Sequence, residues 1–263
     1  MNPFEPSENF IDPLRGVYHD CIVENPSHRE FLLERHAALL CIDLQYLDAV
    51  RGEGVFASEH GNCVSEESQA YYFDRLESLV LPNVRRLQDL FRSHDLEVIH
   101  TRIQSLTQNG RDRGSGHKRL GLLAPPGSRE AEFVPSVAPL PERDEIVINK
   151  TASGVFSSTN IHYVLKNLGI ESLFVVGVYT NECVETTVRD ACDLGYLVTV
   201  VEDCCATVTP ELHAASLATL QDRYAKIMRI AEVEGTVNRL LPEDTAIPEN
   251  VAIATNASKS SGR

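Results

Sequence analysis

The sequence lacks the features that would direct the chain to a membrane or to a nucleic acid. No apolar run among its 263 residues approaches the length of a membrane-spanning helix. Lysine and arginine together number 24 against 38 aspartate and glutamate residues, which leaves a net charge of −14. A surface of that sign repels phosphate backbones and anionic lipids. We therefore expect neither a nucleic acid nor a membrane as a partner.

The sequence also shows no pattern typical of an export signal and no CxxC spacing of cysteines. The first residues have neither the basic region nor the apolar region of a secretory signal peptide, so a cytoplasmic location is expected. The seven cysteines are an odd number and contain no CxxC spacing, which disfavours both a disulfide framework and a structural zinc site. In a reducing compartment, a lone reactive thiol is chemically possible.

Short apolar runs alternate with helical patterns along most of the chain. Several of these runs are continuous, as in strands covered on both faces. The predicted strands lie at residues 37–43, 96–101, 145–149, 172–178, 196–202 and 226–230. Helical spacing is predicted at residues 68–94, 159–168, 183–194, from 209 onward, and at 231–240. This alternation predicts an α/β fold, a three-layer sandwich of helices around a mostly parallel six-stranded sheet.

The composition predicts one main domain at residues 35–245, with a segment on either side. Residues 1–34 are polar and contain several prolines, as in an extended arm or a packed extension, and residues 246–263 are predicted to be a flexible tail. Residues 103–142 form a connection too long for an ordinary loop, which is typical of lids and binding loops. Its basic side chains either cover a site and attract an anion or form a solvated surface.

Three chemically capable side chains follow the carboxyl ends of predicted strands. Asp43 ends the first strand, Lys150 ends the third, and Cys183 follows the fourth at the start of a helix. Ligands of parallel sheets bind at this edge, so the three side chains are expected to converge. Each has an ordinary alternative: a turn-forming aspartate, a solvated lysine at a strand edge, or a buried structural thiol.

Together the three residues suggest nucleophilic catalysis. Cys183 would attack a carbonyl, Asp43 would take the thiol proton and return it to the leaving nitrogen, and Lys150 would hold the carboxylate. The positive end of the helix dipole is expected to lower the pKa of Cys183 and favour its thiolate.

Three segments resemble the isochorismatase-like cysteine hydrolases: LCIDLQ at 40–45, NKTASGVF at 149–156 and GVYTNECVETTVRDA at 177–191. The resemblance implies an α/β Rossmann-like fold and a triad of Asp43, Lys150 and Cys183. It also implies a cis peptide bond between Val178 and Tyr179. This bond would bring the N–H groups of Tyr179 and Cys183 together as an oxyanion hole.

The resemblance also narrows the range of expected substrates. Family members that cleave a vinyl ether can lack the cysteine, so Cys183 favours C–N hydrolysis through a thioester. The region after the first strand lacks the Asp-x-His metal motif of nicotinamidases, so we expect no metal and no cofactor. The last segment is most similar to the ureide amidohydrolases, whose substrates include biuret, triuret and ureidoacrylate.

Those small, flat, amide-rich substrates need paired donors and acceptors. The proposed substrate-binding residues, of which Phe156 could equally be a core residue, are Gln45, Tyr46, Asn181, Gln221 and Phe156. A homo-oligomer is expected from the resemblance. The alternatives are a nicotinamidase, an isochorismatase-type hydrolase, or a non-catalytic binding protein on the same fold.

Overall fold

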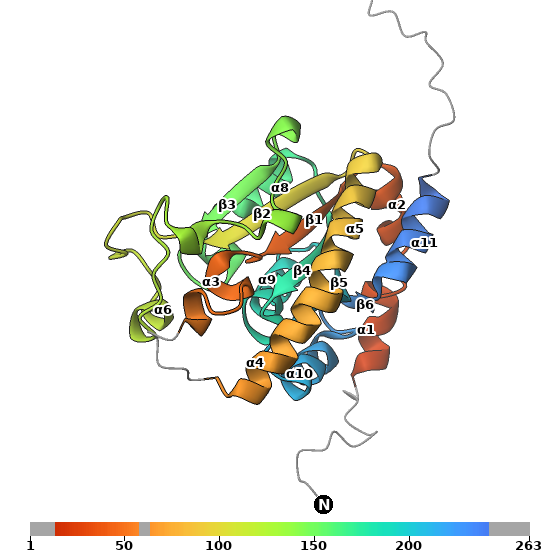
Figure 1. Ribbon diagram of the computed structural model, residues 1–263. Helices are drawn as coiled ribbons and strands as arrows, with labels where there is room; N and C mark the ends of the chain where they lie inside the picture. The colour runs from red at the N-terminus through yellow and green to blue at the C-terminus, as the bar shows by residue number, and fades with distance from the viewer. Residues whose placement is uncertain (1–13, 58–63, 242–263) are drawn as a thin grey trace, which may run out of the picture.

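A parallel β-sheet organises the molecule, and its edges determine where the functional side chains lie. The computed structural model describes residues 14–57 and 64–241. In them, six strands form one sheet in the order β3-β2-β1-β4-β5-β6, and every neighbouring pair is parallel (Figure 1). The strands are β1 (Ala37–Ile42), β2 (Glu97–Ile103), β3 (Ile146–Lys150), β4 (Ser172–Val178), β5 (Leu197–Ala206) and β6 (Lys226–Met228).

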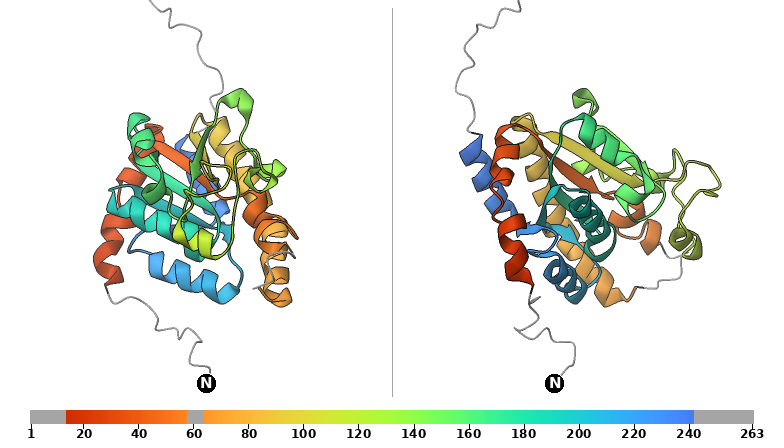
Figure 2. Two further views of the ribbon diagram at one scale, coloured as in Figure 1. Left: turned by 90° about the vertical axis from the view of Figure 1, so that its left-hand side faces the viewer. Right: turned by 180° about the vertical axis from the view of Figure 1, so that it is seen from behind.

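Helices cover both faces of the sheet (Figure 2). One face packs against α2 (Ser27–Leu33), α4 (Glu66–Arg75), α5 (Leu81–Ser93) and α11 (Ile230–Leu240). The other packs against α7 (Val155–Ser158), α8 (Ile161–Asn167), α9 (Glu185–Asp193) and α10 (Pro210–Leu220). The remaining helices are α1 (Arg15–Ile22), α3 (Tyr46–Ala49) and α6 (Ser115–Arg119). This arrangement confirms the predicted three-layer α/β fold.

The central pair of strands, β1 and β4, is fully buried and positions two of the three strand ends. All six residues of β1 and all seven of β4 are buried, which explains their continuous apolar sequences. Ile42 is paired with Gly177, so both strands end at the same level. A Cβ on Gly177 would lie 2.1 Å from the carbonyl oxygen of Ile42, and its φ is +120°. Only glycine permits this close approach of the two backbones.

Several boundaries differ from the prediction. The long helix predicted at 68–94 is divided into α4 and α5 by a π-helical turn at Leu76–Val80. The helix predicted at 159–168 is α8, and a further short helix that was not predicted, α7, precedes it. Thr209 caps α10 as its sequence indicates, since its side chain accepts from the Leu212 N–H.

Beyond the main sheet, residues 14–34 contain α1 and α2, and Leu32 of α2 enters the core. The described part of the 1–34 extension is therefore packed rather than an extended arm. Residues 1–13 and the predicted tail at 246–263 lie outside the described residues. No helix in the described ranges is long and apolar enough to cross a membrane.

Candidate active site

Asp43, Lys150 and Cys183 meet at the carboxyl edge of the sheet. The Lys150 ammonium lies 2.8 Å from Oδ2 of Asp43 and 3.4 Å from Sγ of Cys183. It also donates to the carbonyl oxygen of Ala152 at 3.1 Å. The exposed fractions are 1% for Asp43, 0% for Lys150 and 4% for Cys183. The sequence prediction that these three side chains converge is therefore correct, and they do so out of contact with bulk water.

Backbone geometry directs Asp43 into this edge. The chain leaves β1 at Asp43 with a φ of 54°, a left-handed conformation that aspartate tolerates better than most residues. The Asp43 N–H donates to the Thr101 carbonyl oxygen of β2 at 3.1 Å. The carboxyl adjoins Cys183 and Thr101, although neither makes a well-aligned hydrogen bond to it. Burial raises the pKa of Asp43, and the charge of Lys150 opposes this shift.

The pKa of Cys183 differs from the sequence expectation. Burial raises it well above its usual value, and the nearby charge of Lys150 lowers it only in part. Cys183 does lie at the start of a helical segment, in the π-helical turn at Thr180–Val184 that continues directly into α9, but burial outweighs what this position would contribute. Burial therefore favours the thiol, and the expected lowering of the Cys183 pKa is wrong.

The turn that carries Cys183 is held from several sides. The predicted cis peptide bond between Val178 and Tyr179 is present, which confirms that expectation. His213 of α10 lies 2.9 Å from the Thr180 hydroxyl through Nδ1, and Ser216 donates to the Thr180 carbonyl oxygen at 3.1 Å. The Thr187 hydroxyl donates to the Cys183 carbonyl oxygen at 2.6 Å. These contacts hold in place the turn that carries the cysteine.

Gln45 proves to be a positioning residue. Its amide nitrogen donates to the carbonyl oxygens of Ile103 at 2.9 Å and Glu130 at 2.8 Å. Its amide oxygen accepts from the Ile103 N–H at 2.6 Å. Both amide hydrogens and the oxygen are thus used by the backbone. We correct the substrate-binding prediction, because Gln45 joins the end of β1 to β2 and to the Arg129–Ala131 turn.

Two predicted substrate-binding residues lie close in sequence to the triad and remain candidates. Asn181 is in the same π-helical turn as Cys183, half-buried, and its Oδ1 accepts from the Thr207 hydroxyl at 2.5 Å. Tyr46 follows Asp43 by three residues, and the Arg129 guanidinium lies 3.5 Å from its ring centroid.

The other two predicted substrate-binding residues lie elsewhere. Gln221 follows α10 and precedes β6, so it lies at the amino edge of the parallel sheet, opposite the triad. Phe156 packs with the core on the α8–α9 face, and its ring centroid is 5.7 Å from that of Tyr196. The structure therefore favours a structural role for both residues.

The long segment at 103–142 packs beside Lys150. The Gly114 N–H donates to the Thr151 carbonyl oxygen at 2.8 Å, and the Gln104 N–H donates to that of Lys150 at 3.0 Å. His117 of α6 is buried, and its Nδ1 has no hydrogen-bond partner among the described residues. Burial, followed by the charge of Lys150, lowers the pKa of His117. The segment therefore places a neutral imidazole near the triad, which the sequence analysis did not identify.

Asp48 was also missed. It lies in α3, five residues after Asp43, and its exposed fraction is 3%. Burial and then the negative charge of Asp43 raise the pKa of Asp48 well above its usual value. No sequence periodicity connects the two residues, because α3 begins only at Tyr46, so the burial of Asp48 beside the triad follows from tertiary packing.

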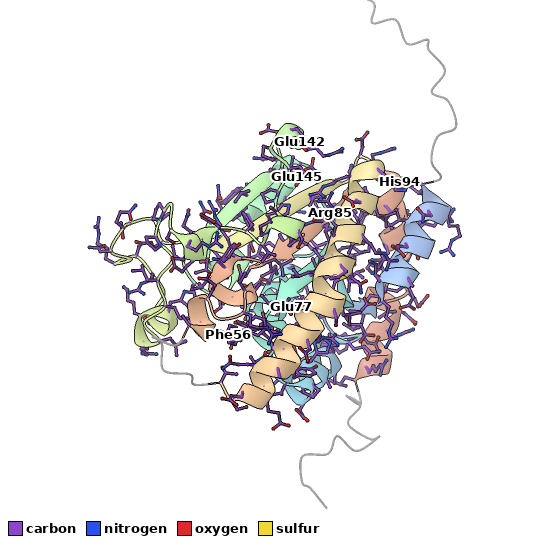
Figure 3. The ribbon with its side chains drawn as sticks, in the orientation of Figure 1. Phe56, Glu77, Arg85, His94, Glu142 and Glu145 are labelled. Atoms are coloured by element: carbon purple, nitrogen blue, oxygen red, sulfur yellow. The ribbon has the colours of Figure 1, made fainter. Side chains whose placement is uncertain are left out.

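His100 has a structural role, as its place within a strand predicts. Its Nε2 lies 3.2 Å from the Glu145 carboxylate, and Arg92 Nε donates to the same carboxylate at 2.8 Å. Figure 3 marks Glu145 beside the start of β3. Burial opposes ionisation of Glu145, but hydrogen bonds from His100 and Arg92 lower its pKa to about 2. Within the described ranges, no three histidine, cysteine, aspartate or glutamate side chains are grouped to hold a metal ion.

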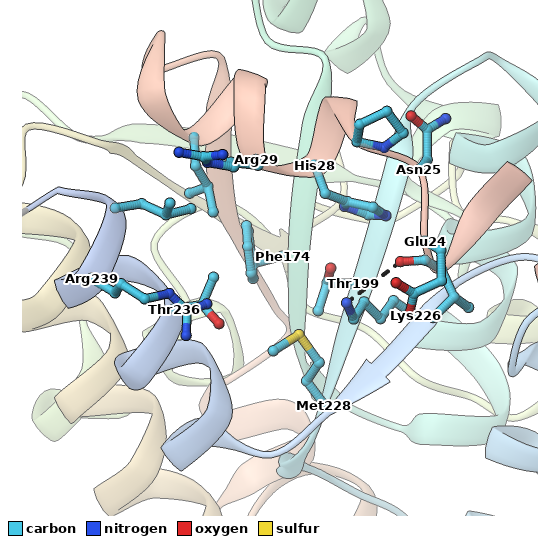
Figure 4. Close-up of a pocket in the computed structure, with 14 residues that line it drawn as sticks. Glu24, Asn25, His28, Arg29, Phe174, Thr199, Lys226, Met228, Thr236 and Arg239 are labelled. Atoms are coloured by element: carbon cyan, nitrogen blue, oxygen red, sulfur yellow. Dashed lines mark hydrogen bonds between the residues drawn. The ribbon is translucent and has the colours of Figure 1, made fainter. Parts of the chain in front are cut away.

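A cavity of about 490 Å³ lies away from the triad. Its floor includes Phe174 and Met228, and its walls come from the segment between α1 and α2 and from the end of α11 (Figure 4). Lys226 crosses it to donate to the Val23 carbonyl oxygen at 3.4 Å. The cavity adjoins the beginnings of β5 and β6, so it is separate from the catalytic edge.

Comparison with known proteins finds a matching family model and several relatives of this chain. A family model described as the isochorismatase domain matches residues 37–232. A probable inactive nicotinamidase of Arabidopsis thaliana is 32% identical over 58% of this chain and 80% of its own length. The ureidoacrylate amidohydrolase RutB of Caulobacter segnis is 33% identical over 46% of this chain, which spans about half (51%) of that relative.

Solved structures share the fold. A cysteine hydrolase from Pseudomonas syringae pv. phaseolicola superposes with a TM-score of 0.65 at 20% identity, covering 78% of this chain and 94% of its own. At this identity the likeness concerns the fold alone.

Proposed function

The chain belongs to the isochorismatase family of hydrolases, and we propose that it cleaves a C–N bond of a small carbamoyl or ureide substrate through a thioester on Cys183. The observation that carries this proposal is the position of Lys150. One ammonium group contacts the carboxyl of Asp43 at 2.8 Å and the thiol of Cys183 at 3.4 Å. An acid, a cation and a thiol in mutual contact form the usual arrangement for activating a nucleophile.

In the proposed first step, Sγ of Cys183 attacks the substrate carbonyl carbon while its proton passes to the Asp43 carboxylate. The N–H groups of Tyr179 and Cys183 would stabilise the resulting oxyanion. The C–N bond then breaks, and Asp43 returns the proton to the leaving nitrogen, which departs as ammonia or an amine. Water hydrolyses the thioester: Asp43 takes its proton, and the regenerated thiol receives that proton back.

The proposal also covers the cofactor requirement, the bound partner and the oligomeric state. The residues needed for these steps come from the chain itself, so the mechanism calls for no cofactor. A small amide or ureide is the proposed partner, bound near Asn181 and Tyr46, and assembly into a homo-oligomer is proposed from the family resemblance.

A second candidate function is nicotinamide hydrolysis. It is supported by the Arabidopsis thaliana relative, whose name places it among the nicotinamidases. That relative is named as probably inactive, so the comparison also supports the alternative of a binding protein without catalytic activity.

An ammonia-release screen over biuret, triuret, ureidoacrylate, N-carbamoylglycine and nicotinamide would test the proposal. The wild type should release ammonia from at least one ureide, and Cys183→Ala should release none. Intact-mass spectrometry after rapid acid quenching should detect an acyl adduct on the wild type alone. Full activity of Cys183→Ala, or turnover of nicotinamide alone, would contradict the proposed function.

A further inference from the structure

A second buried carboxyl lies beside the triad, and the proposed chemistry does not use it. Asp48 belongs to α3, and its backbone carbonyl oxygen accepts from the Tyr72 hydroxyl at 2.8 Å and approaches the Tyr179 hydroxyl at 3.3 Å. Tyr179 follows the cis peptide bond in the turn that carries Cys183, four residues before the cysteine. Asp48 is therefore fixed between α3 and the turn that carries the nucleophile.

No cation among the described residues forms an ion pair with the carboxyl of Asp48, although the charge of Lys150 and the Tyr179 hydroxyl both act on it. In the same residues its buried Oδ2 has no hydrogen-bond partner. Its charge nevertheless acts on Lys150 and on Cys183, and Asp43 acts on it in turn. The ammonium of Lys150, whose charge acts on Asp48, is already in contact with Asp43 at 2.8 Å.

The charges around the triad are therefore unequal. Glu182, on the exposed side of the turn, interacts with both Lys150 and Asp48. Three carboxyl groups thus share one ammonium, and the neighbouring His117 is held neutral. Burial and the neighbouring carboxyls disfavour the charged form, which raises the pKa of Asp48 well above its usual value. A ligand that supplies N–H groups or positive charge would satisfy this carboxyl.

We propose that Asp48 is the specificity-determining residue of the substrate site, where it binds the N–H groups of an uncharged or cationic ureide and disfavours substrates that carry a carboxylate. This inference rests on the proposed function, because it assigns the substrate class to the same site.

The chemistry of the carboxyl group supports this class. A protonated carboxyl donates one hydrogen bond and accepts others, which matches the alternating C=O and N–H groups of an uncharged ureide. An ionised carboxyl accepts two parallel N–H bonds from an amidinium group, as it does from arginine. A substrate carboxylate would face Asp48 and Glu182 together, and like charges at close range repel.

Binding to a protein that cannot turn over is the direct test. Calorimetry would measure the affinity of Cys183→Ala for biuret, amidinourea and N-carbamoylglycine, alone and combined with Asp48→Asn. Cys183→Ala should bind biuret and amidinourea more tightly than N-carbamoylglycine. The added Asp48→Asn should weaken amidinourea binding by about tenfold or more, the effect of one charge-assisted hydrogen bond. Asp193→Asn, which removes one exposed negative charge from the end of α9, is the matched control and should change nothing.

Kinetics on the active protein provide a second reading. Asp48→Asn should raise KM for amidinourea much more than it lowers kcat, and should shift the ratio of kcat/KM for amidinourea over N-carbamoylglycine by at least about tenfold. Asp48→Ser should show the same shift, which separates specificity from an effect on folding.

The two proposals fail in different ways. Equal affinities with and without Asp48→Asn, or no binding of biuret and amidinourea by Cys183→Ala, would overturn the role of Asp48. Tight binding without any turnover by the wild type would instead contradict the proposed hydrolysis while leaving the recognition role intact.

Discussion

Replacing Lys150 with methionine should separate the stability of the site from its chemistry. The substitution keeps the length and apolar stem of the side chain but removes the ammonium 2.8 Å from Asp43. Both partners are buried, with exposed fractions of 0% and 1%, so the Asp43 charge would lose its compensating cation. Breaking a buried ion pair from one side costs about 3 to 5 kcal/mol. For a domain of this size, that loss lowers Tm by roughly 6 to 20 °C.

The loss should depend on pH in a defined direction. Burial already raises the pKa of Asp43, and removing Lys150 takes away the charge that opposes this shift. A carboxyl whose pKa is higher in the folded than in the unfolded protein destabilises the fold as pH rises through that interval. The deficit of Lys150→Met should therefore be small at pH 4 and should grow towards pH 8.

Two further variants complete the test. Asp43→Asn combined with Lys150→Met removes both charges and should recover most of the unfolding free energy without restoring ammonia release. Lys166→Met breaks the exposed pair with Glu171, at 2.9 Å, and should change stability by less than about 1 kcal/mol. Urea unfolding followed by circular dichroism measures each value. If Lys150→Met matched the Lys166→Met control, or kept wild-type turnover, the reasoning would be refuted.

Three other predictions follow from the same contacts. Cys183 should react slowly with iodoacetamide below pH 9, because burial raises its pKa; rapid alkylation at pH 7, followed by mass spectrometry, would contradict a resting thiol. Gln45→Leu should lower the unfolding free energy by about 3 kcal/mol or more, since it leaves three backbone groups, two of them fully buried, without a hydrogen-bond partner; an unchanged urea midpoint would refute its positioning role. Between pH 5 and 8 the wild type should lose more stability than Asp48→Asn does, because a raised folded pKa destabilises the fold as pH increases; parallel pH profiles in thermal unfolding would count against a buried, uncompensated Asp48.

The sequence was sufficient to predict those parts of the site that lie at the ends of strands. Continuous apolar runs predict buried parallel strands, and parallel strands bring Asp43, Lys150 and Cys183 to one edge whatever the loops do. The same rule excludes Gln221 from that edge, because a helix between parallel strands returns the chain to the amino edge before the next strand begins. That misplacement could therefore have been avoided from the sequence alone.

The sequence was insufficient where the outcome depends on how distant segments dock. Gln45 is occupied by Ile103 and Glu130, whose positions follow from the packing of residues 103–142 against the end of β1. Cys183 was expected to ionise because its sequence places it at a helix start. Its environment is instead set by burial, a tertiary property that local patterns do not report. Loop docking and burial therefore decided the assignments that failed.

Burial of the triad is compatible with the proposed chemistry because the proton transfer conserves charge. Before transfer the site holds a neutral thiol and the pair of Asp43 with Lys150; afterwards it holds a neutral carboxyl and the pair of Cys183 with Lys150. Desolvation raises the pKa of both acids, so it largely cancels in the difference that governs the transfer. Lys150 contacts Oδ2 at 2.8 Å and Sγ at 3.4 Å, and its charge is compensated in either state. A buried site can therefore keep Cys183 protonated at rest and still form the nucleophile when a carbonyl arrives to accept it.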